Sequence, residues 1–285
     1  MQAPSTLPLT AIQAALFAAG QWAVEMARKP FEVEEKGPED FVTAIDRTLD
    51  QRLAAQFQQW FPADGIITEE NTASIPLMEQ NFSRLWLIDP LDGTEDFING
   101  RPNYAIMAGL LVEGQAIAGW VLRPESGQLF YGGEGLGLWT AQGLEFPSLL
   151  VPVVTPPPTL TYCPILLGAR DQKRYGPALQ EMIPEAQFYT LGSFGLKVLE
   201  VILGRAGLYL YLNQRVKLWD TVGPIALAHQ AGLVCCDLNG QTLQFSPDAL
   251  DLSTLAHHQP IVVGWPHYIE ALLPRLRQAI ANAAA

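Results

Sequence analysis

Apolar segments of two different periods alternate along the chain, and this alternation limits the folds that it can adopt. Leu9–Arg28 and the stretch from about Val42 to Trp60 repeat their apolar residues with the period of a helix. Ile66–Thr68 and Leu85–Ile88 are short apolar runs of the kind that form buried strands. Because helices and strands alternate in both halves, we expect a layered α/β or α+β fold.

The middle of the first half is dominated by strand-like runs. Ala105–Leu111, Gln115–Leu122 and Gln128–Gly132 are separated by short turn-forming segments, which predicts an antiparallel meander. Before the second helix, Glu32–Asp40 is rich in charged residues and contains Gly and Pro, so a loop is expected there.

A proline-rich connector, Pro147–Pro158, follows the meander. We therefore place a domain boundary near residue 143, which divides the chain into segments 1–143 and 144–285. The second segment is expected to contain strands at Tyr162–Leu167, Ala206–Leu212 and Gly232–Asp237, and helices at Tyr175–Met182, Ser193–Leu203, after Trp219 and near Tyr268–Ala281.

The charge balance excludes one class of partner. The chain has 17 Lys and Arg against 29 Asp and Glu, a formal net charge of −12, which argues against binding a nucleic-acid polymer. Its early apolar stretch, Ala11–Val24, has no cation before it and is too short to span a bilayer. The three cysteines match neither a disulfide framework nor a zinc spacing. We expect a cytoplasmic protein without a membrane segment.

A pair of acidic residues follows the second predicted strand. Asp89 and Asp92 lie three positions apart around a proline, so both can point at one spot, and the bent backbone can present the Leu91 carbonyl as well. Oxygen ligands of this kind suit hard divalent ions such as Mg²⁺. Gly93 allows close backbone approach, and Thr94 begins a helical run whose N–H groups can meet a phosphate. The alternative for this motif alone is a simple turn, since Asp-Pro and Asp-Gly favour turns.

Other acidic residues have ordinary explanations when each is taken singly. Glu69 and Glu70 follow the first predicted strand, where an exposed charged loop is the alternative. Asp220 follows Trp219 at the start of a helical run, where an N-cap is the alternative. Asp46 lies on an otherwise apolar helix face and needs a hydroxyl, a water or a cation as its partner.

Together, these acidic sites resemble the inositol monophosphatase family, including its 3'(2'),5'-bisphosphate nucleotidase and CysQ-like members. The resemblance spans most of the chain in the right order. Its residues are Val42-Thr43-Ala44-Ile45-Asp46, Glu69-Glu70, Trp86 through Thr94 with Phe97, and Trp219-Asp220 with Ala231-Gly232; Lys36, Gly192-Ser193 and Leu196-Lys197 also lie where such members often have them.

The resemblance implies an αβαβα sandwich of the inositol monophosphatase and fructose-bisphosphatase type. It further implies a Mg²⁺-dependent, typically lithium-sensitive phosphomonoesterase, often a homodimer, that uses two or three Mg²⁺ ions on a small phosphorylated metabolite. The implied residues are Glu69, Asp89, the Leu91 carbonyl, Asp92 and Asp220 as metal ligands; Thr94, Asp46 and Glu69 in catalysis; the Gly93 and Thr94 N–H groups for phosphate; and Ser193, Lys197 and Asn213 for substrate contact.

The substrate depends on fewer residues. Asn213 stands where some inositol-specific members carry a glutamate, which disfavours inositol. The basic run Arg215-Val216-Lys217 can meet a second phosphate or can be a solvated strand end. We lean to 3'(2'),5'-bisphosphate nucleotidase or broad sugar-phosphate activity. The alternatives are inositol monophosphatase, histidinol-phosphate phosphatase, or a catalytically inactive metabolite-binding protein on the same fold.

Overall fold

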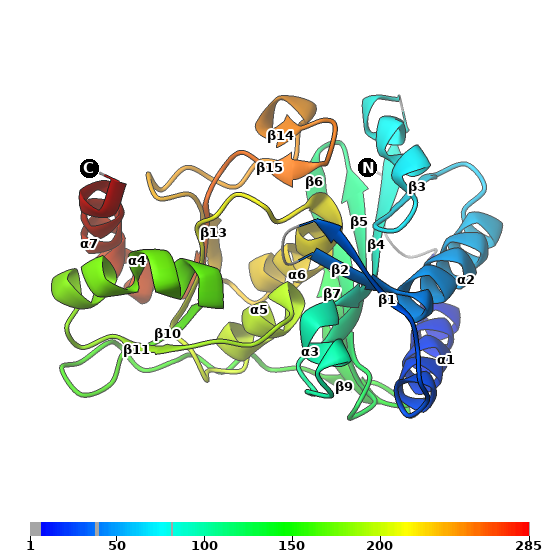
Figure 1. The fold of residues 1–285 in the computed structure, drawn as a ribbon, viewed down its shortest axis with the longest axis horizontal. Helices are drawn as coiled ribbons and strands as arrows, with labels where there is room; N and C mark the ends of the chain where they lie inside the picture. The colour runs from blue at the N-terminus through cyan, green and yellow to red at the C-terminus, as the bar shows by residue number, and fades with distance from the viewer. Residues whose placement is uncertain (1–6, 38–39, 81, 285) are drawn as a thin grey trace.

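The computed structural model describes residues 7–37, 40–80 and 82–284, and their helices and sheets stack in alternating layers (Figure 1). The expected αβαβα order is confirmed. From one outer side to the other, the layers are helices α1 (Leu9–Ala27) and α2 (Ala44–Trp60), a seven-stranded sheet, helices α5 (Phe194–Ile202) and α6 (Leu218–Gln230), a five-stranded sheet, and helices α4 (Ala169–Met182) and α7 (Pro266–Ala284).

The larger sheet contains the expected meander. Its first two strands, β3 and β4, are parallel and the remaining neighbours are antiparallel. In spatial order the strands are β3 (Gly65–Thr68), β4 (Arg84–Asp92), β5 (Ala105–Val112), β6 (Gln115–Arg123), β7 (Gln128–Gly133), β8 (Gly137–Gln142) and β9 (Ser148–Leu149).

Helices cover both faces of this sheet, which explains why its central strands read as unbroken apolar runs. On β4, Trp86 and Ile88 pack into the core beneath α1 and α2, whereas Leu85 and Leu87 belong to the core on the other face. Successive side chains of a strand point to opposite faces, so an apolar residue is needed at every position.

The smaller sheet has the order β11-β10-β12-β16-β13, with β10 parallel to both β11 and β12. The sequence did not predict β11 or β16, since runs of three or four residues show little periodicity. Its strands are β10 (Pro164–Leu167), β11 (Gln187–Tyr189), β12 (Leu208–Tyr211), β13 (Val234–Cys236) and β16 (Ile261–Gly264).

Glycines let α6 lie directly against the larger sheet. A Cβ added at Gly119 of β6 would lie 2.0 Å from the carbonyl oxygen of Gly223 in α6, and one added at Gly109 of β5 would lie 2.4 Å from the Gly223 nitrogen. Backbone therefore touches backbone at this crossing. This contact positions the first turn of α6, which carries Asp220.

The loop expected at Glu32–Asp40 is wrong, because a hairpin of β1 (Val33–Gly37) and β2 (Asp40–Thr43) begins there. Positions 38 and 39 of that expected loop lie outside the described residues. The second helix also starts later than predicted, because Thr43 has extended backbone and its hydroxyl accepts from the Ile45 N–H at 3.1 Å. The residues of β1 are mostly charged and exposed. They therefore lack the alternation of apolar and polar residues by which a hairpin strand is recognised in a sequence.

Short elements complete the fold. They are α3 (Thr94–Ile98), β14 (Leu250–Asp251), β15 (Ala256–His257) and the 3₁₀ helices Thr72–Glu79 and Pro247–Ala249. All three cysteines are buried and free. Within the described part of the chain, every helix is too short or too polar to cross a lipid bilayer. The division near residue 143 stays a prediction.

Candidate active site and metal centre

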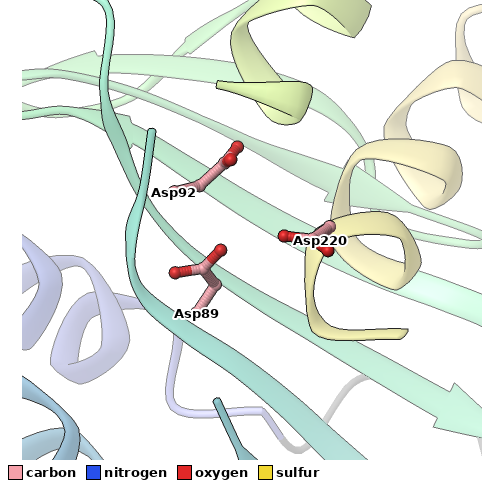
Figure 2. A group of neighbouring side chains, drawn as sticks. All are labelled: Asp89, Asp92 and Asp220. Atoms are coloured by element: carbon pink, nitrogen blue, oxygen red, sulfur yellow. The ribbon is translucent and has the colours of Figure 1, made fainter. Parts of the chain in front are cut away.

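Three carboxylates from two distant parts of the chain meet at one point (Figure 2). Asp89 and Asp92 come from the end of β4 and Asp220 from the first turn of α6, and each offers an oxygen within 4.8 Å of the other two. The pairing of β4 with β5 shifts register between Asp89 and Asp92. Such an irregularity re-aims side chains that a regular strand would direct differently. We call these residues the acid cluster.

Asp89 shows that the acid cluster suits a cation. Its side chain is 1 % exposed; Oδ1 accepts from the Leu91 N–H at 2.9 Å, and the buried Oδ2 has no hydrogen-bond partner in the structure. Burial, then the charges of Glu69, Asp92 and Asp220, raise the pKa of Asp89 well above its ordinary value. A buried carboxylate oxygen among like charges is unfavourable unless a proton or a metal ion satisfies it. The oxygen-only donor set favours a hard divalent ion.

The other two cluster members are held in place by backbone N–H groups and, for Asp92, also by a hydroxyl group. Oδ2 of Asp92 accepts from the Gly195 N–H at 3.0 Å and also from the Ser193 hydroxyl. Oδ2 of Asp220 accepts from the N–H of Lys217, the N-cap residue of α6, at 2.7 Å. Asp220 therefore also caps its helix from the third position. Burial, reinforced by the charge of Asp92, raises the pKa of Asp220 to about 7.

Beside the acid cluster, a threonine hydroxyl is hydrogen-bonded to a buried carboxylate. Thr94 Oγ1 lies 3.1 Å from Asp46 Oδ1 and 3.0 Å from the Leu91 carbonyl oxygen. Asp46 is 1 % exposed, and its other oxygen accepts from the Thr43 hydroxyl and from the Thr43 N–H at 3.0 Å. Burial raises the pKa of Asp46 to about 6 against the lowering effect of these hydrogen bonds. The pair can accept a proton near neutral pH.

Gly93 makes the turn between β4 and α3 possible. Its φ is 95°, in the left-handed region, and an added Cβ would lie 2.9 Å from the Asn103 carbonyl oxygen. A larger residue would push the Thr94 backbone away from the acid cluster.

The site consists of a small cavity that opens beside a larger one. A cavity of about 140 Å³ is lined by the acid cluster with Glu69, Leu91, Gly93 and Thr94. A cavity of about 440 Å³ shares Glu69, Asp92 and Asp220 with it. The acidic side chains therefore stand where the cavities meet.

Glu69 lies at both cavities, although the group of mutually close carboxylates among the described residues does not include it. Lys36 of β1 places its Nζ 3.2 Å from Glu69 Oε1 and 2.8 Å from Glu70 Oε1. Burial, together with the charge of Glu69, raises the pKa of Glu70 to about 7. The β1–β2 hairpin thus supplies an ammonium group at the edge of the acidic site.

Comparison with known proteins assigns the chain to one family. The model of the inositol monophosphatase family matches residues 5–281. The chain belongs to the inositol monophosphatase family. It is 28% identical over 249 residues to the inositol monophosphatase of Mesembryanthemum crystallinum, covering 83% of this chain and 89% of the relative. It is 27% identical over 219 residues to the 3'(2'),5'-bisphosphate nucleotidase CysQ of Salmonella typhimurium, covering 77% of this chain and 85% of the relative.

A solved structure agrees at the level of the fold. The Thermotoga maritima IMPase superimposes with a TM-score of 0.77 at 22% identity, covering 96% of this chain and 98% of that one. The chain is therefore a phosphatase of the inositol monophosphatase family with that family's layered fold.

The residues expected to contact substrate have different positions in this phosphatase. Ser193 is fully buried behind Asp92, and its oxygen also accepts from the Leu196 N–H at 3.0 Å, so it positions Asp92 instead of lining a cavity. Lys197 does line the larger cavity and donates to the Gly192 carbonyl at 3.1 Å. The Asn213 oxygen accepts from the Arg215 N–H at 3.2 Å, and Asn213 lies beside the wall of that cavity without forming it.

Sequence reasoning missed part of the larger cavity's wall. Arg170 and Tyr211 line it, just after and at the carboxyl ends of the neighbouring parallel strands β10 and β12. In open α/β sheets, ligands bind outside the carboxyl ends of parallel strands, so this position was the available signal. Asp251, Thr254 and Ala256 of the β14–β15 hairpin also line this cavity and carry no motif of their own.

Proposed function

We propose that this phosphatase is a Mg²⁺-dependent phosphomonoesterase that hydrolyses a small phosphorylated metabolite by attack of water on phosphorus. The observation that carries the proposal is the acid cluster, with its unpartnered Asp89 oxygen, next to the Thr94–Asp46 pair. Ion-binding oxygens and a proton acceptor then share one small cavity.

The residues that would hold Mg²⁺ are Glu69, Asp89, the Leu91 carbonyl, Asp92 and Asp220. All five offer oxygen, which Mg²⁺ prefers, and none is the nitrogen or sulfur donor that favours zinc. When bound, Mg²⁺ supplies positive charge that acidifies water and offsets the charge of the phosphate and of the departing alkoxide.

Thr94 and Asp46 would activate the attacking water. The Thr94 hydroxyl donates its proton toward Asp46, so its oxygen can accept a hydrogen bond from water. As water attacks, its proton passes to Thr94 Oγ1 while the Thr94 proton passes to Asp46 Oδ1. With a pKa of about 6, Asp46 is mostly ionised at neutral pH and basic enough for this role. The Gly93 and Thr94 N–H groups would hold the phosphate, and Lys197 would contact the substrate.

The relatives indicate which substrates to test first. One relative is a bisphosphate nucleotidase, and one solved neighbour is an IMPase and NADP phosphatase complexed with NADP. These names, together with Asn213, favour a 3'(2'),5'-bisphosphate nucleotidase or a broad sugar-phosphate phosphatase. Inositol monophosphatase and histidinol-phosphate phosphatase are the alternatives, followed by an inactive metabolite-binding protein. Lithium sensitivity, a homodimer and a cytoplasmic location stay predictions.

The proposal is tested by measuring the release of inorganic phosphate from a nucleotide bisphosphate, a sugar phosphate, an inositol phosphate and histidinol phosphate. Each compound is assayed once with Mg²⁺ and once with EDTA. We expect Mg²⁺-stimulated turnover that Asp92→Asn lowers at least about 100-fold in kcat/KM, because disturbing even the outer partners of a metal ligand costs 10–100-fold. Asp248→Asn is the matched control, since it removes the same charge from an unburied carboxylate outside both cavities. No metal-stimulated release from any compound would favour the metabolite-binding protein.

A further inference from the structure

The β14–β15 hairpin is joined to the segment that leads into α6 (Figure 1). The His257 N–H donates to the Val216 carbonyl at 3.0 Å, and the Leu218 N–H donates to the Leu255 carbonyl at 3.1 Å. Between these two bonds, Lys217 forms a β-bridge with the hairpin. Residues 215–217 also line the larger cavity. The hairpin therefore fixes the backbone on both sides of Lys217.

Leu255 has an unusual backbone conformation at this contact. Its φ is 57°, in the left-handed region, and its side chain is fully buried. Such a conformation is sterically unfavourable for leucine and persists only where surrounding contacts impose it. The Leu255 N–H donates to the Asp251 carbonyl at 2.6 Å, while its own carbonyl accepts from Leu218. The hairpin is therefore shaped to fit the start of α6.

One side-chain hydrogen bond joins the hairpin to the first turn of α6. His257 Nε2 lies 2.8 Å from Thr221 Oγ1, and both side chains are buried. Thr221 directly follows Asp220 in the sequence. Its hydroxyl oxygen also lies 3.2 Å from the carbonyl oxygens of Lys217 and Leu218, where α6 begins. Thr221 therefore connects His257 to the turn that carries Asp220.

The His257 ring has little else to bind. Phe245 packs against it with its ring centroid 5.5 Å away, and Nδ1 has no hydrogen-bond partner among the described residues. Burial lowers the pKa of His257 to about 4, so the ring is neutral near pH 7. In either neutral tautomer, Nε2 can form one hydrogen bond with the Thr221 hydroxyl. Because an unpaired buried nitrogen is costly, this bond fixes the distance between the hairpin and the helix turn.

We infer that His257 is a positioning residue for Asp220: through Thr221, it holds the first turn of α6 where the Asp220 carboxylate joins the acid cluster. The contacts brace Asp220 from two sides, because its Oδ2 accepts from the N–H of hairpin-bound Lys217 at 2.7 Å and its neighbour Thr221 binds His257. This inference rests on the proposed function, in which Asp220 is a Mg²⁺ ligand. A ligand that is less firmly oriented binds its metal less tightly.

Mg²⁺ binding in the absence of substrate tests the inference. Calorimetric titration of Mg²⁺ into the metal-free protein would compare the parent with His257→Leu, which removes the hydrogen bond and keeps a large apolar side chain. Mg²⁺ affinity should fall about tenfold, the lower end of the range for lost partners of a metal ligand. His257→Gln should recover much of the affinity, because its amide can reach the position of Nε2. At saturating Mg²⁺, kcat of both variants should stay close to the parent value.

His267→Leu is the matched control, since His267 Nε2 donates to the Thr155 carbonyl at 3.0 Å and lines neither cavity of the site. It should lower the melting temperature and leave Mg²⁺ affinity unchanged. Parent-like Mg²⁺ affinity in His257→Leu, or an equal loss in His267→Leu, would overturn the inference and leave the proposed function intact. No Mg²⁺ binding by the parent would instead overturn the proposed metal site.

Thr221→Val removes the same hydrogen bond from the other side and changes the size of the side chain little. It should also weaken Mg²⁺ binding about tenfold. The double variant of His257→Leu and Thr221→Val should bind Mg²⁺ about as tightly as either single variant, because both lose one shared bond. Losses that multiply would show that the two residues act separately, and the inference would then be wrong. For a variant too unstable for calorimetry, the rise in melting temperature with Mg²⁺ gives the same comparison.

Discussion

The Ser193 hydroxyl donates a hydrogen bond to Oδ2 of Asp92, a residue 101 positions earlier in the sequence. The Gly195 N–H donates to the same oxygen, so two hydrogen bonds hold this carboxylate against the start of α5. The orientation of one proposed metal ligand therefore depends on a helix from the other half of the chain.

Replacing Ser193 by alanine should weaken Mg²⁺ binding. Loss of a hydrogen bond that orients a ligand typically costs 10–100-fold in metal affinity, so we expect the Mg²⁺ concentration for half-maximal activity to rise about 10–100-fold. The loss of the α5 N-cap should also cost about 1 kcal/mol of stability. A Mg²⁺ titration of activity and a thermal melt measure the two effects, with the exposed Ser148→Ala as control. An unchanged Mg²⁺ requirement would contradict this role.

Replacing Thr94 by alanine should slow the chemical step. Because its hydroxyl links the attacking water to Asp46, kcat should fall about 10²–10⁴-fold, the usual range for a positioned proton-transfer group. The Mg²⁺ requirement should change little, and Thr94→Ser should recover much of the rate because it restores the hydroxyl. Steady-state kinetics at saturating Mg²⁺ measure this; an effect on KM alone would remove Thr94 from proton transfer.

The acid cluster and Asp46 beside it should make stability depend on pH and on Mg²⁺. Burial raises the pKa of Asp46 to about 6 and that of Asp220 to about 7, and it raises the pKa of Asp89 and Asp92 as well. Such groups bind protons more tightly in the folded than in the unfolded chain, so the metal-free protein loses stability as the pH rises from about 4 through about 7.

Thermal melts in EDTA and in Mg²⁺ check this. The metal-free melting temperature should be lower at pH 8 than at pH 5.5, and the rise caused by Mg²⁺ should be larger at pH 8, where the ligands are ionised. Asp92→Asn, which removes one of the mutually repelling charges, should reduce both differences. Equal Mg²⁺ stabilisation at the two pH values would contradict the prediction.

Adding a side chain at the glycines between α6 and the larger sheet should destabilise the protein. In Gly119→Ala the added Cβ would meet the Gly223 carbonyl oxygen at 2.0 Å, so backbone must move, and overpacking of this kind costs about 1–3 kcal/mol. Chemical denaturation should show the loss, and a displaced Asp220 should lower activity as well. Gly176→Ala in α4 is the matched control, since its Cβ has ordinary space and alanine favours a helix. Equal stability of the two variants would mean that this crossing is loosely packed.

Much of the site could be predicted from local sequence. Asp89 and Asp92 follow an apolar strand run and are separated by a proline and a leucine. Two acidic residues so close together at the end of a strand can be recognised in the sequence, and their spacing is enough to predict that both side chains reach the same site. The start of α2 could not be placed, because the extended backbone and capping bonds of Thr43 override the helical period of its neighbours. The roles of Ser193 and Asn213 were not predictable either, since each depends on a partner that only folding supplies.

The sequence by itself determined the layered order of helices and strands, the family, and the acidic residues that meet at the site, because periodicity and strand-end motifs are properties of short stretches. Only the tertiary structure decided that Ser193 serves Asp92, that Arg170 joins Arg215 and Lys217 on one cavity wall, and that glycines bring α6 against the sheet. Those relationships join residues far apart along the chain. They exist only once the sheets, helices and hairpins have packed, and no local pattern encodes which distant side chain will be the neighbour.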